Sequence, residues 1–309
     1  INKNSVIFKS IIDSVMKEGF IEDSVETILA NKACKINVIK HKYHDRWFAD
    51  PFILEVTNSK IILLAEEFMY SNSKGRIAQL TIDRKSYKLI ANKTILDLPT
   101  HLSFPLIRRV KEDIFICPEN SAGGELSIYK LSKNSCEKIE TILHKPVYDA
   151  VDITINGDKY LFMTEGSKFE EQNGNRLKIY KQQGCKYIFY QQYFFKENIA
   201  RMAGDLFWHE GVLYRPAQEC NNYIYGHALS LQKVIVNDTG FDFQEIIRLT
   251  SNAKEGGDGI HTFNMYKGIT VVDVKQNVPS YITKFKQMLN KKLKINDASL
   301  EKENPNISL

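Results

Sequence analysis

The sequence has few of the features that mark membrane, disulfide-rich or metal-binding proteins. No uninterrupted apolar run reaches the roughly 18 residues of a membrane helix, and the mean hydropathy is −0.31. The five cysteines form no CxxC pair, which favours reduced thiols in a cytoplasmic protein. No cluster has metal-ligand spacing, and a net charge of +5 is too small for a nucleic-acid-binding surface. We therefore expect a soluble protein without metal, cofactor or nucleic-acid partner.

Strand-like apolar runs recur along the chain at intervals of about 50 residues. The second run of each unit begins at Ile61, Ile114, Tyr160, Val212 and Ile269. The first four units each hold a third and a fourth run, with turn residues between them. Four short strands per repeat are typical of a propeller blade, so the sequence predicts an all-β, five-bladed β-propeller over residues 34–275. A β-sandwich with evenly spaced strands is the alternative.

The two ends of the repeat array suggest how the propeller closes. The fifth unit runs out of strands after Asp273, whereas Lys35–Lys42 has strand character and precedes the first unit. We expect this N-terminal strand to complete the last blade, because closure removes an open sheet edge. Residues 5–31 show apolar residues at helical spacing, broken at Gly19. This pattern predicts two short helices in an appendage that spans residues 1–33.

Residues 276–309 are predicted to form a basic amphipathic helix and a disordered tail. Between Tyr281 and Asn296 there are five lysines, no acid, and apolar side chains at helical spacing. Such a helix either docks on the propeller with its lysines in solvent or attaches to an anionic membrane surface. The expected location is cytoplasmic, and in the second case peripheral on the inner face of the membrane.

Polar residues stand at equivalent ends of the predicted innermost strands. In a propeller these strands line the axis, so residues at matching positions converge on one mouth of the channel. The set expected there is Asp50, His101, Asp149, Asp205, Asp258 and His261. The two histidines are either core residues or acid/base groups.

Several carboxylates have the placement for paired acid/base work. Asp50 and Asp149 are the best pair, since two nearby carboxyls acquire different pKa values and split the two roles. The alternative is that each aspartate caps a turn by accepting hydrogen bonds from backbone N–H groups. Glu119 ends the second strand of its blade and is placed to project into the same mouth. Glu66 and Glu67 hold the matching place in the first blade, and we expect Glu67 to point inward because only one of two neighbours on a strand does.

The fourth unit adds Arg201, Arg215 and Gln218 around an apolar strand. Arginine in such a setting suits bidentate recognition of phosphate or carboxylate. A salt bridge to a neighbouring aspartate such as Asp205 is the alternative.

Short sequence phrases spread over about residues 40–275 together resemble those of a known family. The matching phrases are Trp47-Phe48-Ala49-Asp50-Pro51-Phe52, His101-Leu102-Ser103-Phe104-Pro105, Pro118-Glu119, Gly124-Glu125-Leu126, Tyr148-Asp149-Ala150, Arg201 with Gly204, Tyr214-Arg215-Pro216-Ala217-Gln218, and His261-Thr262-Phe263. The chain resembles the propeller found at the N-terminus of plant glucosamine inositolphosphorylceramide transferases and in bacterial polysaccharide gene products. That family is similar in fold to the five-bladed propellers of family 43 glycoside hydrolases.

The resemblance implies roles for individual residues. Asp50, in its Ala-Asp-Pro phrase, matches the general base of the hydrolases, and Asp149 matches their modulating carboxylate. The hydrolase pattern also needs a glutamic acid in the fourth blade, where this chain has Arg201, Asp205 and Arg215 instead. Because a phosphate leaving group needs cations rather than an acid, this departure favours transfer over hydrolysis.

The first hypothesis is a glycosyltransferase of bacterial surface polysaccharide biosynthesis. Its partners would be a sugar donor with a phosphate group, of nucleotide-sugar or phosphoribosyl type, and a glycan or lipid-linked glycan acceptor. Arg201 and Arg215 would bind the phosphate, while His101, Gln218 and His261 would hold sugar hydroxyls. The alternatives are a furanosidase-like glycoside hydrolase with Glu119 as acid, and a carbohydrate-binding propeller without activity.

Overall fold

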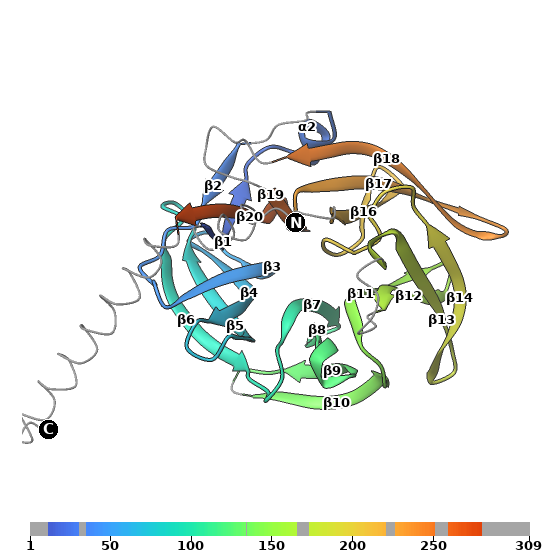
Figure 1. The fold of residues 1–309 in the computed structure, drawn as a ribbon, viewed down its shortest axis with the longest axis horizontal. Helices are drawn as coiled ribbons and strands as arrows, with labels where there is room; N and C mark the ends of the chain where they lie inside the picture. Colours follow the sequence, from blue (N-terminus) through green and yellow to red (C-terminus); the bar gives the residue numbers. More distant parts are fainter. Residues whose placement is uncertain are drawn as a thin grey trace, which may run out of the picture.

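The computed structural model describes residues 12–30, 35–133, 135–165, 173–220, 226–250 and 259–279 of the chain. These residues form five four-stranded sheets in which all neighbouring strands are antiparallel. The sheets follow one another around a central axis like blades (Figure 1). The predicted all-β, five-bladed propeller is confirmed.

Each blade is a meander in which every strand is hydrogen-bonded to the next. The first blade contains β3 (Arg46–Val56), β4 (Lys60–Met69), β5 (Lys74–Asp83) and β6 (Leu89–Leu96). The second contains β7 (Ser103–Val110), β8 (Asp113–Glu119), β9 (Leu126–Leu131) and β10 (Cys136–Leu143). The third contains β11 (Val147–Ile155), β12 (Asp158–Glu165), β13 (Arg176–Gln183) and β14 (Lys186–Phe194). The fourth contains β15 (Phe207–His209), β16 (Val212–Glu219), β17 (Ala228–Asn237) and β18 (Gly240–Thr250). The fifth contains β19 (Gly259–Tyr266), β20 (Ile269–Pro279), β1 (Ile12–Ile21) and β2 (Ile36–Val38). Of these strands, β3, β7, β11 and β19 lie nearest the centre (Figure 1).

The fifth blade is completed from the N-terminal part of the chain. β2, which lies inside the predicted strand Lys35–Lys42, is the outermost strand of this blade, so that prediction is confirmed. Between β2 and β20 lies β1, which pairs with β20 along its whole length. The prediction of two helices over residues 5–31 is therefore wrong for Ile12–Ile21. The helical spacing of apolar residues there is outweighed by the backbone hydrogen bonds that the free edge of β20 offers.

Helix makes a small contribution to the described residues. One α-helix, α2 (Val25–Ala30), follows β1, and two short 3-10 turns occur at Ser121–Gly123 and Asn173–Asn175. No helix among the described residues has the length and apolar character needed to cross a membrane. The helix predicted over Tyr281–Asn296 lies outside the described residues.

The core lies between the faces of adjacent blades. In β4 the consecutive residues Leu63, Leu64 and Ala65 are fully buried, although neighbours on a strand face opposite ways. Both faces of the sheet are therefore covered, and the apolar clusters join residues of neighbouring blades, such as Phe52 and Phe104. This packing holds the inner strands rigidly around the axis, where the polar residues gather.

Candidate active site on the propeller axis

Three inner strands carry a backbone bulge at the same phase. Asp50, Phe104 and Asp149 adopt left-handed conformations with φ of 50°, 44° and 47°. Each coincides with a shift of strand register, in β3, β7 and β11 respectively. A bulge removes one residue from the ladder and turns its backbone N–H out of the sheet. Because a left-handed non-glycine residue costs about 1 kcal/mol or more, other contacts must stabilise it.

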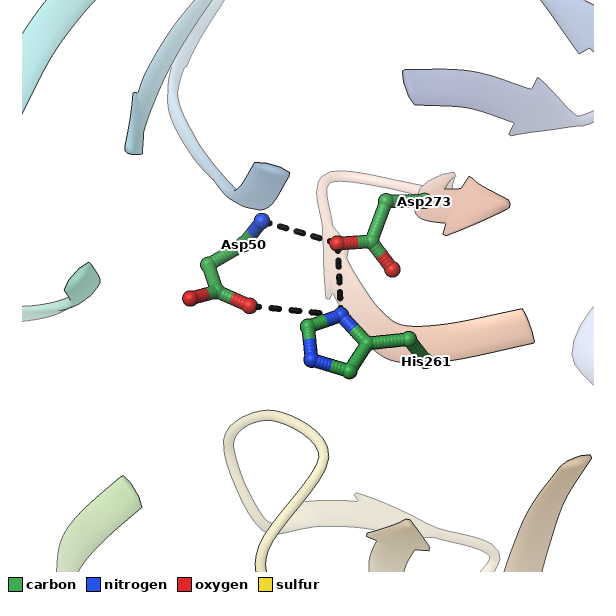
Figure 2. A group of neighbouring side chains, drawn as sticks. All are labelled: Asp50, His261 and Asp273. Atoms are coloured by element: carbon green, nitrogen blue, oxygen red, sulfur yellow. Dashed lines mark hydrogen bonds and ion pairs between the residues drawn. The ribbon is translucent and has the colours of Figure 1, made fainter. Parts of the chain in front are cut away.

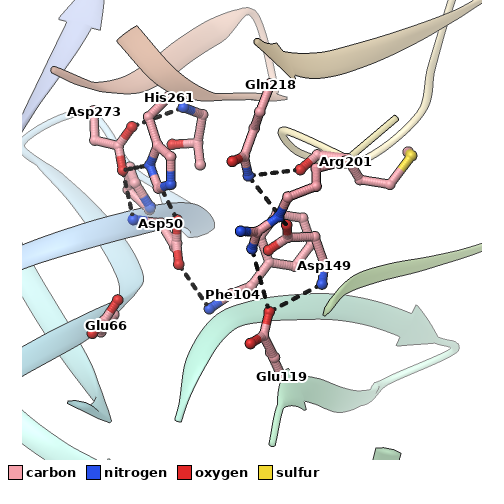
Figure 3. Close-up of polar contacts among 12 residues, drawn as sticks. Asp50, Glu66, Phe104, Glu119, Asp149, Arg201, Gln218, His261 and Asp273 are labelled. Carbon is pink, nitrogen blue, oxygen red and sulfur yellow. Dashed lines mark hydrogen bonds and ion pairs between the residues drawn. The ribbon is translucent and has the colours of Figure 1, made fainter. Parts of the chain in front are cut away.

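Those contacts come from carboxylates of the preceding blade (Figure 3). Asp273 Oδ2 accepts a hydrogen bond from the Asp50 N–H at 2.9 Å, and Asp50 Oδ2 accepts one from the Phe104 N–H at 3.1 Å. Glu119 Oε2 accepts one from the Asp149 N–H at 3.1 Å. The fold therefore fixes one oxygen of each of these acids, and with it the orientation of the carboxyl group.

Ten of the predicted site residues lie among the described residues, and six of them line one cavity of about 260 Å³. They are Asp50, His101, Glu119, Asp149, Arg201 and His261. Asp50 and Asp149, from the first and third blades, thus share the cavity, as the circular arrangement of the repeat predicted. Asp258 lies outside the described residues.

Burial changes the protonation of the acids in this cavity. It raises the pKa of Asp50 to about 7, with the charges of Asp273 and Asp149 adding to the effect and His261 opposing it. It also raises the pKa of Glu119 to about 8, and the neighbouring Asp149 adds to this shift. Burial therefore favours the protonated forms of both Asp50 and Glu119.

The two cations in the cavity are engaged by acids. Arg201 Nε donates to Asp149 Oδ2 at 2.6 Å, and its Nη2 lies 3.8 Å from Glu119 Oε2. His261 Nδ1 lies 2.9 Å from Asp273 Oδ2 and 3.5 Å from Asp50 Oδ1 (Figure 2). Burial opposes a charge on His261, but Asp273 and Asp50 outweigh it and raise the pKa of the imidazole to about 9.

The same three residues are the group best placed to hold a metal ion in the described part of the chain. Asp50, His261 and Asp273 offer ligand atoms that all lie within 4.8 Å of one another. A metal needs the neutral imidazole, whereas the geometry favours an imidazolium whose Nδ1–H donates to Asp273. Cation binding here would therefore require His261 to lose its proton.

Glu66, and not Glu67, points into the cavity. The Glu67 carboxylate lies on the other face of β4, where it accepts hydrogen bonds from Arg46 Nη1 at 2.5 Å, Arg76 Nε at 2.7 Å and Asn92 Nδ2 at 2.8 Å. The expectation for Glu67 is wrong because strand alternation leaves open which of two neighbours faces inward. Arg76, which stands opposite Glu67 in β5, was the sequence signal for an ion pair.

The remaining predicted site residues lie behind the cavity or away from it. Gln218 Nε2 donates to Asp149 Oδ2 at 3.2 Å and thus supports that acid from behind. Asp205 forms an ion pair with Arg108, at 2.7 Å. Arg215 is fully buried and donates to the carbonyl oxygens of Ile199 and Ala200. The structure therefore places neither Asp205 nor Arg215 where it could contact a ligand in the cavity.

Two further acids near the cavity were not predicted. Asp273 fixes both the Asp50 N–H and His261, and Glu18 stands opposite it across the β1–β20 pair. Glu18 is buried, and this burial raises its pKa to about 8. A single acid within the apolar run Ile269–Val274 was a signal for Asp273. Glu18 had none, because its environment depends on the distant pairing of β1 with β20.

Comparison with known proteins assigns the chain to a family. The profile of the family described as "Glucosamine inositolphosphorylceramide transferase 1, N-terminal" matches residues 21–282. The chain belongs to this family. It is 28% identical to glucosamine inositolphosphorylceramide transferase 1 of Oryza sativa subsp. japonica over 202 residues, and 27% identical to that of Arabidopsis thaliana over 198 residues. Both matches cover 62% of this chain but only 27% and 26% of the relatives, so the chain spans about a quarter of their length.

Solved structures of this family's fold include several glycoside hydrolases. RS223 β-xylosidase aligns with a TM-score of 0.51 at 11% identity, covering 76% of this chain and 93% of the xylosidase. The exo-β-1,3-galactanase of Phanerochaete chrysosporium aligns with a TM-score of 0.51 at 8% identity, covering 72% and 56%. The GH43_1 enzyme of Xanthomonas citri gives 0.50 at 10% identity, covering 77% and 88%. At these identities the likeness shows a shared fold and nothing about substrate.

Proposed function

We propose that this chain catalyses glycosyl transfer in the assembly of a surface polysaccharide, with the glycosyl unit held in the cavity on the propeller axis. The supporting observation is the convergence of the buried carboxyl groups of Asp50, Glu119 and Asp149 on one cavity. Its volume of about 260 Å³ is just below the 300–1,000 Å³ or so of pockets for drug-sized ligands and suits a single sugar unit. The relatives are named as transferases, which agrees with this role.

In this proposal each acid has one step. Glu119, whose protonated form is favoured by burial, donates its proton to the oxygen that leaves the anomeric carbon. Asp50 in its ionised form takes a proton from the attacking acceptor hydroxyl, so charge is conserved as one bond breaks and the other forms. Asp149, held by Arg201 and Gln218, fixes the Arg201 guanidinium between itself and Glu119.

Of the two arginines predicted to bind the phosphate of an activated donor, one remains available in the cavity. Arg201 lines the cavity, whereas Arg215 is buried behind it. Since a phosphate leaving group needs no proton donor, the protonated Glu119 favours hydrolysis of a plain glycoside as a second candidate function. Water would then take the place of the acceptor hydroxyl.

Association with the cytoplasmic face of a membrane is a separate part of the proposal. It is supported by the basic amphipathic pattern of Tyr281–Asn296. Sedimentation of the full chain with phosphatidylserine vesicles should exceed that with neutral vesicles at low salt, and equal sedimentation would disprove this attachment.

Turnover assays with the full chain test the proposed function. Nucleotide sugars and phosphoribosyl-type donors are offered with oligosaccharide acceptors, and aryl glycosides are offered without a donor. We expect donor-dependent acceptor extension that falls at least about 1,000-fold in Asp50→Asn, while Asp113→Asn, an exposed aspartate of β8, leaves it unchanged. Release of sugar from the aryl glycoside without a donor would support hydrolysis instead. Sugar binding without any turnover would show a binding module.

A further inference from the structure

The outer rim of the propeller consists of sheet edges. Each blade ends in a strand whose outer side carries backbone N–H and C=O groups, and in the third blade this strand is β14 (Figure 1). No other strand among the described residues pairs with that side of β14. An open edge can recruit a strand from another chain, so natural proteins protect their edges.

The other four outer strands are protected by short length, by charge or by a covering segment. β2 has only three residues. β10 and β18 each carry three charged side chains, which are Glu137, Lys138, Glu140, Asp242, Glu245 and Arg248. β6 carries Lys93, and the segment before β3 covers its start, where the Leu89 N–H donates to the Lys40 carbonyl oxygen at 3.0 Å.

β14 has none of these protections. Its only charged residue is Lys186, at the first position, and Tyr187–Phe194 contains five aromatic side chains and no charge, glycine or proline. High β-propensity, low charge and the absence of proline promote association between strands. A bulge at Tyr190 does not set β14 apart, because β6, β10 and β18 are interrupted in the same way. The composition of β14 is therefore that of a strand whose edge is covered.

The side chains of β14 also form an exposed apolar strip. Four of them are between 39% and 62% exposed, namely Ile188, Phe189, Tyr190 and Phe194. At roughly 200 Å² per side chain they present about 400 Å² of apolar surface, which is the size of patch that marks interaction sites. Two such strips, with the backbone groups between them, would bury roughly 1,000 Å² in total, which reaches the lower limit of a specific interface.

We propose that β14 pairs edge to edge with β14 of a second copy of this chain, so that the third blades of two propellers join into one continuous sheet. A strand without charge meets no like charge when it pairs with itself, whereas β10 or β18 would. The pairing is antiparallel, because only then do both strands make the same hydrogen bonds, as two-fold symmetry requires. Full overlap of Lys186–Phe194 places the symmetry axis beside the middle residue, Tyr190.

This dimer is independent of the reaction that the cavity catalyses. β14 lies on the outer rim and contributes no residue to the lining of the cavity (Figure 1). Substitutions on β14 should therefore change the state of association and leave the site intact.

Sedimentation velocity of the full chain over a range of concentrations tests the dimer. We expect a species of twice the chain mass of 35.6 kDa. Phe189→Lys places a charge on the edge and should raise the dissociation constant of the dimer at least about 10-fold. Ile90→Lys on β6 is the matched control, since Phe189 and Ile90 are both 53% exposed, and it should leave the dimer unchanged. Both variants should fold because both side chains are exposed, and thermal unfolding checks this.

Crosslinking tests the strand and its direction. Antiparallel overlap brings Tyr190 of the two copies together and holds the exposed Cys185 of each copy at opposite ends of the pair. A short bismaleimide should therefore link Tyr190→Cys into dimers, while Ile90→Cys stays at the low level of the native chain.

Three outcomes would overturn the proposal. One is a monomer at every concentration, and another is a dimer that Phe189→Lys and Ile90→Lys weaken equally, which would indicate a different interface. The third is growth beyond the dimer, which would show open-ended aggregation through this edge and not a closed pair. Crosslinking of the native chain through Cys185 as strongly as of Tyr190→Cys would contradict the antiparallel arrangement.

Discussion

Two charged clusters near the propeller axis contain the same residue types but differ in how completely their carboxylates are paired with cations. In one, Arg108 donates to Asp152 Oδ1 at 2.7 Å and forms a bidentate pair with Asp205, at 2.7 and 3.0 Å. Lys159 lies 2.9 Å from the second oxygen of Asp152. Every carboxylate oxygen there has a cationic donor, and the cluster joins the second and third blades to the segment before the fourth. In the axial cavity, acids outnumber donors.

The difference shows in the protonation of Asp152. Burial alone would raise the pKa of this acid, but Arg108 and Lys159 lower it below its usual value, whereas at Asp205 burial outweighs Arg108 and the pKa rises. In the cavity, burial prevails and the pKa values of Asp50 and Glu119 rise. The fully paired cluster of Arg108, Asp152, Asp205 and Lys159 is therefore a structural staple that joins parts of the fold. Incomplete pairing around a cavity instead indicates a place for a ligand.

The largest effect that should separate the two clusters is on turnover. Glu119→Gln removes the proton donor, so we expect activity to fall about 100- to 10,000-fold, with the least loss for donors whose leaving groups need no protonation. Glu112→Gln, an exposed residue of the same blade, is the control. A uniform loss across all leaving groups, or no loss, would contradict the role as acid.

Breaking the staple should reduce stability and leave chemistry intact. Arg108→Met leaves Asp152 and Asp205 without their shared cation, which should lower the free energy of unfolding by about 2–3 kcal/mol. Lys130→Met, which breaks an exposed pair with Asp113, should change it by less than about 0.5 kcal/mol. Urea unfolding of both variants measures this, and a turnover loss in folded Arg108→Met protein would contradict a purely structural role.

The third effect is a pH dependence of stability carried by the acids at and behind the cavity. Asp50, Glu119 and Glu18 have folded pKa values of about 7, 8 and 8, above those of the unfolded chain. The folded state then binds protons more tightly, so the free energy of unfolding should fall as pH rises from 5 to 8. His261, with its pKa raised to about 9, acts in the same direction, since its stabilising charge is lost as pH rises through that value.

Glu18→Gln isolates one of these contributions. The substitution keeps the shape of the protonated acid and removes its titration, so the variant should gain on the order of 2 kcal/mol over the native protein at pH 8 and little at pH 5. Chemical unfolding at the two pH values measures the difference. An equal effect at both would mean that Glu18 does not titrate in this range.

Asp50 and Asp149 were located from the repeat itself. They stand at the same phase of two blades, so the geometry of the repeat brings them together. Arg201 and Arg215 were assigned from their neighbourhood, where no periodicity decides which way a side chain points, and only Arg201 lines the cavity. Glu66 was passed over for its neighbour on the strand. Glu67 faces the other way because its carboxylate forms ion pairs with Arg46 and Arg76.

The misassigned N-terminal helix has a related cause. Local apolar spacing is all that a short window contains, whereas β1 is specified by a partner about 250 residues away in sequence. The same distance hid Glu18. Long-range pairing also explains why the predicted closure was found in β2 but underestimated, since two strands of the last blade come from the N-terminal part of the chain and not one.

The origin of β1 matters to anyone who expresses this domain by itself. The family profile begins at residue 21, the last residue of β1, so a fragment cut at that boundary would lose nearly all of that strand. Such a fragment would leave β20 with a bare edge and would lack Glu18, which stands opposite Asp273. Its misfolding or aggregation would then reflect the position of the cut and say nothing about the propeller itself.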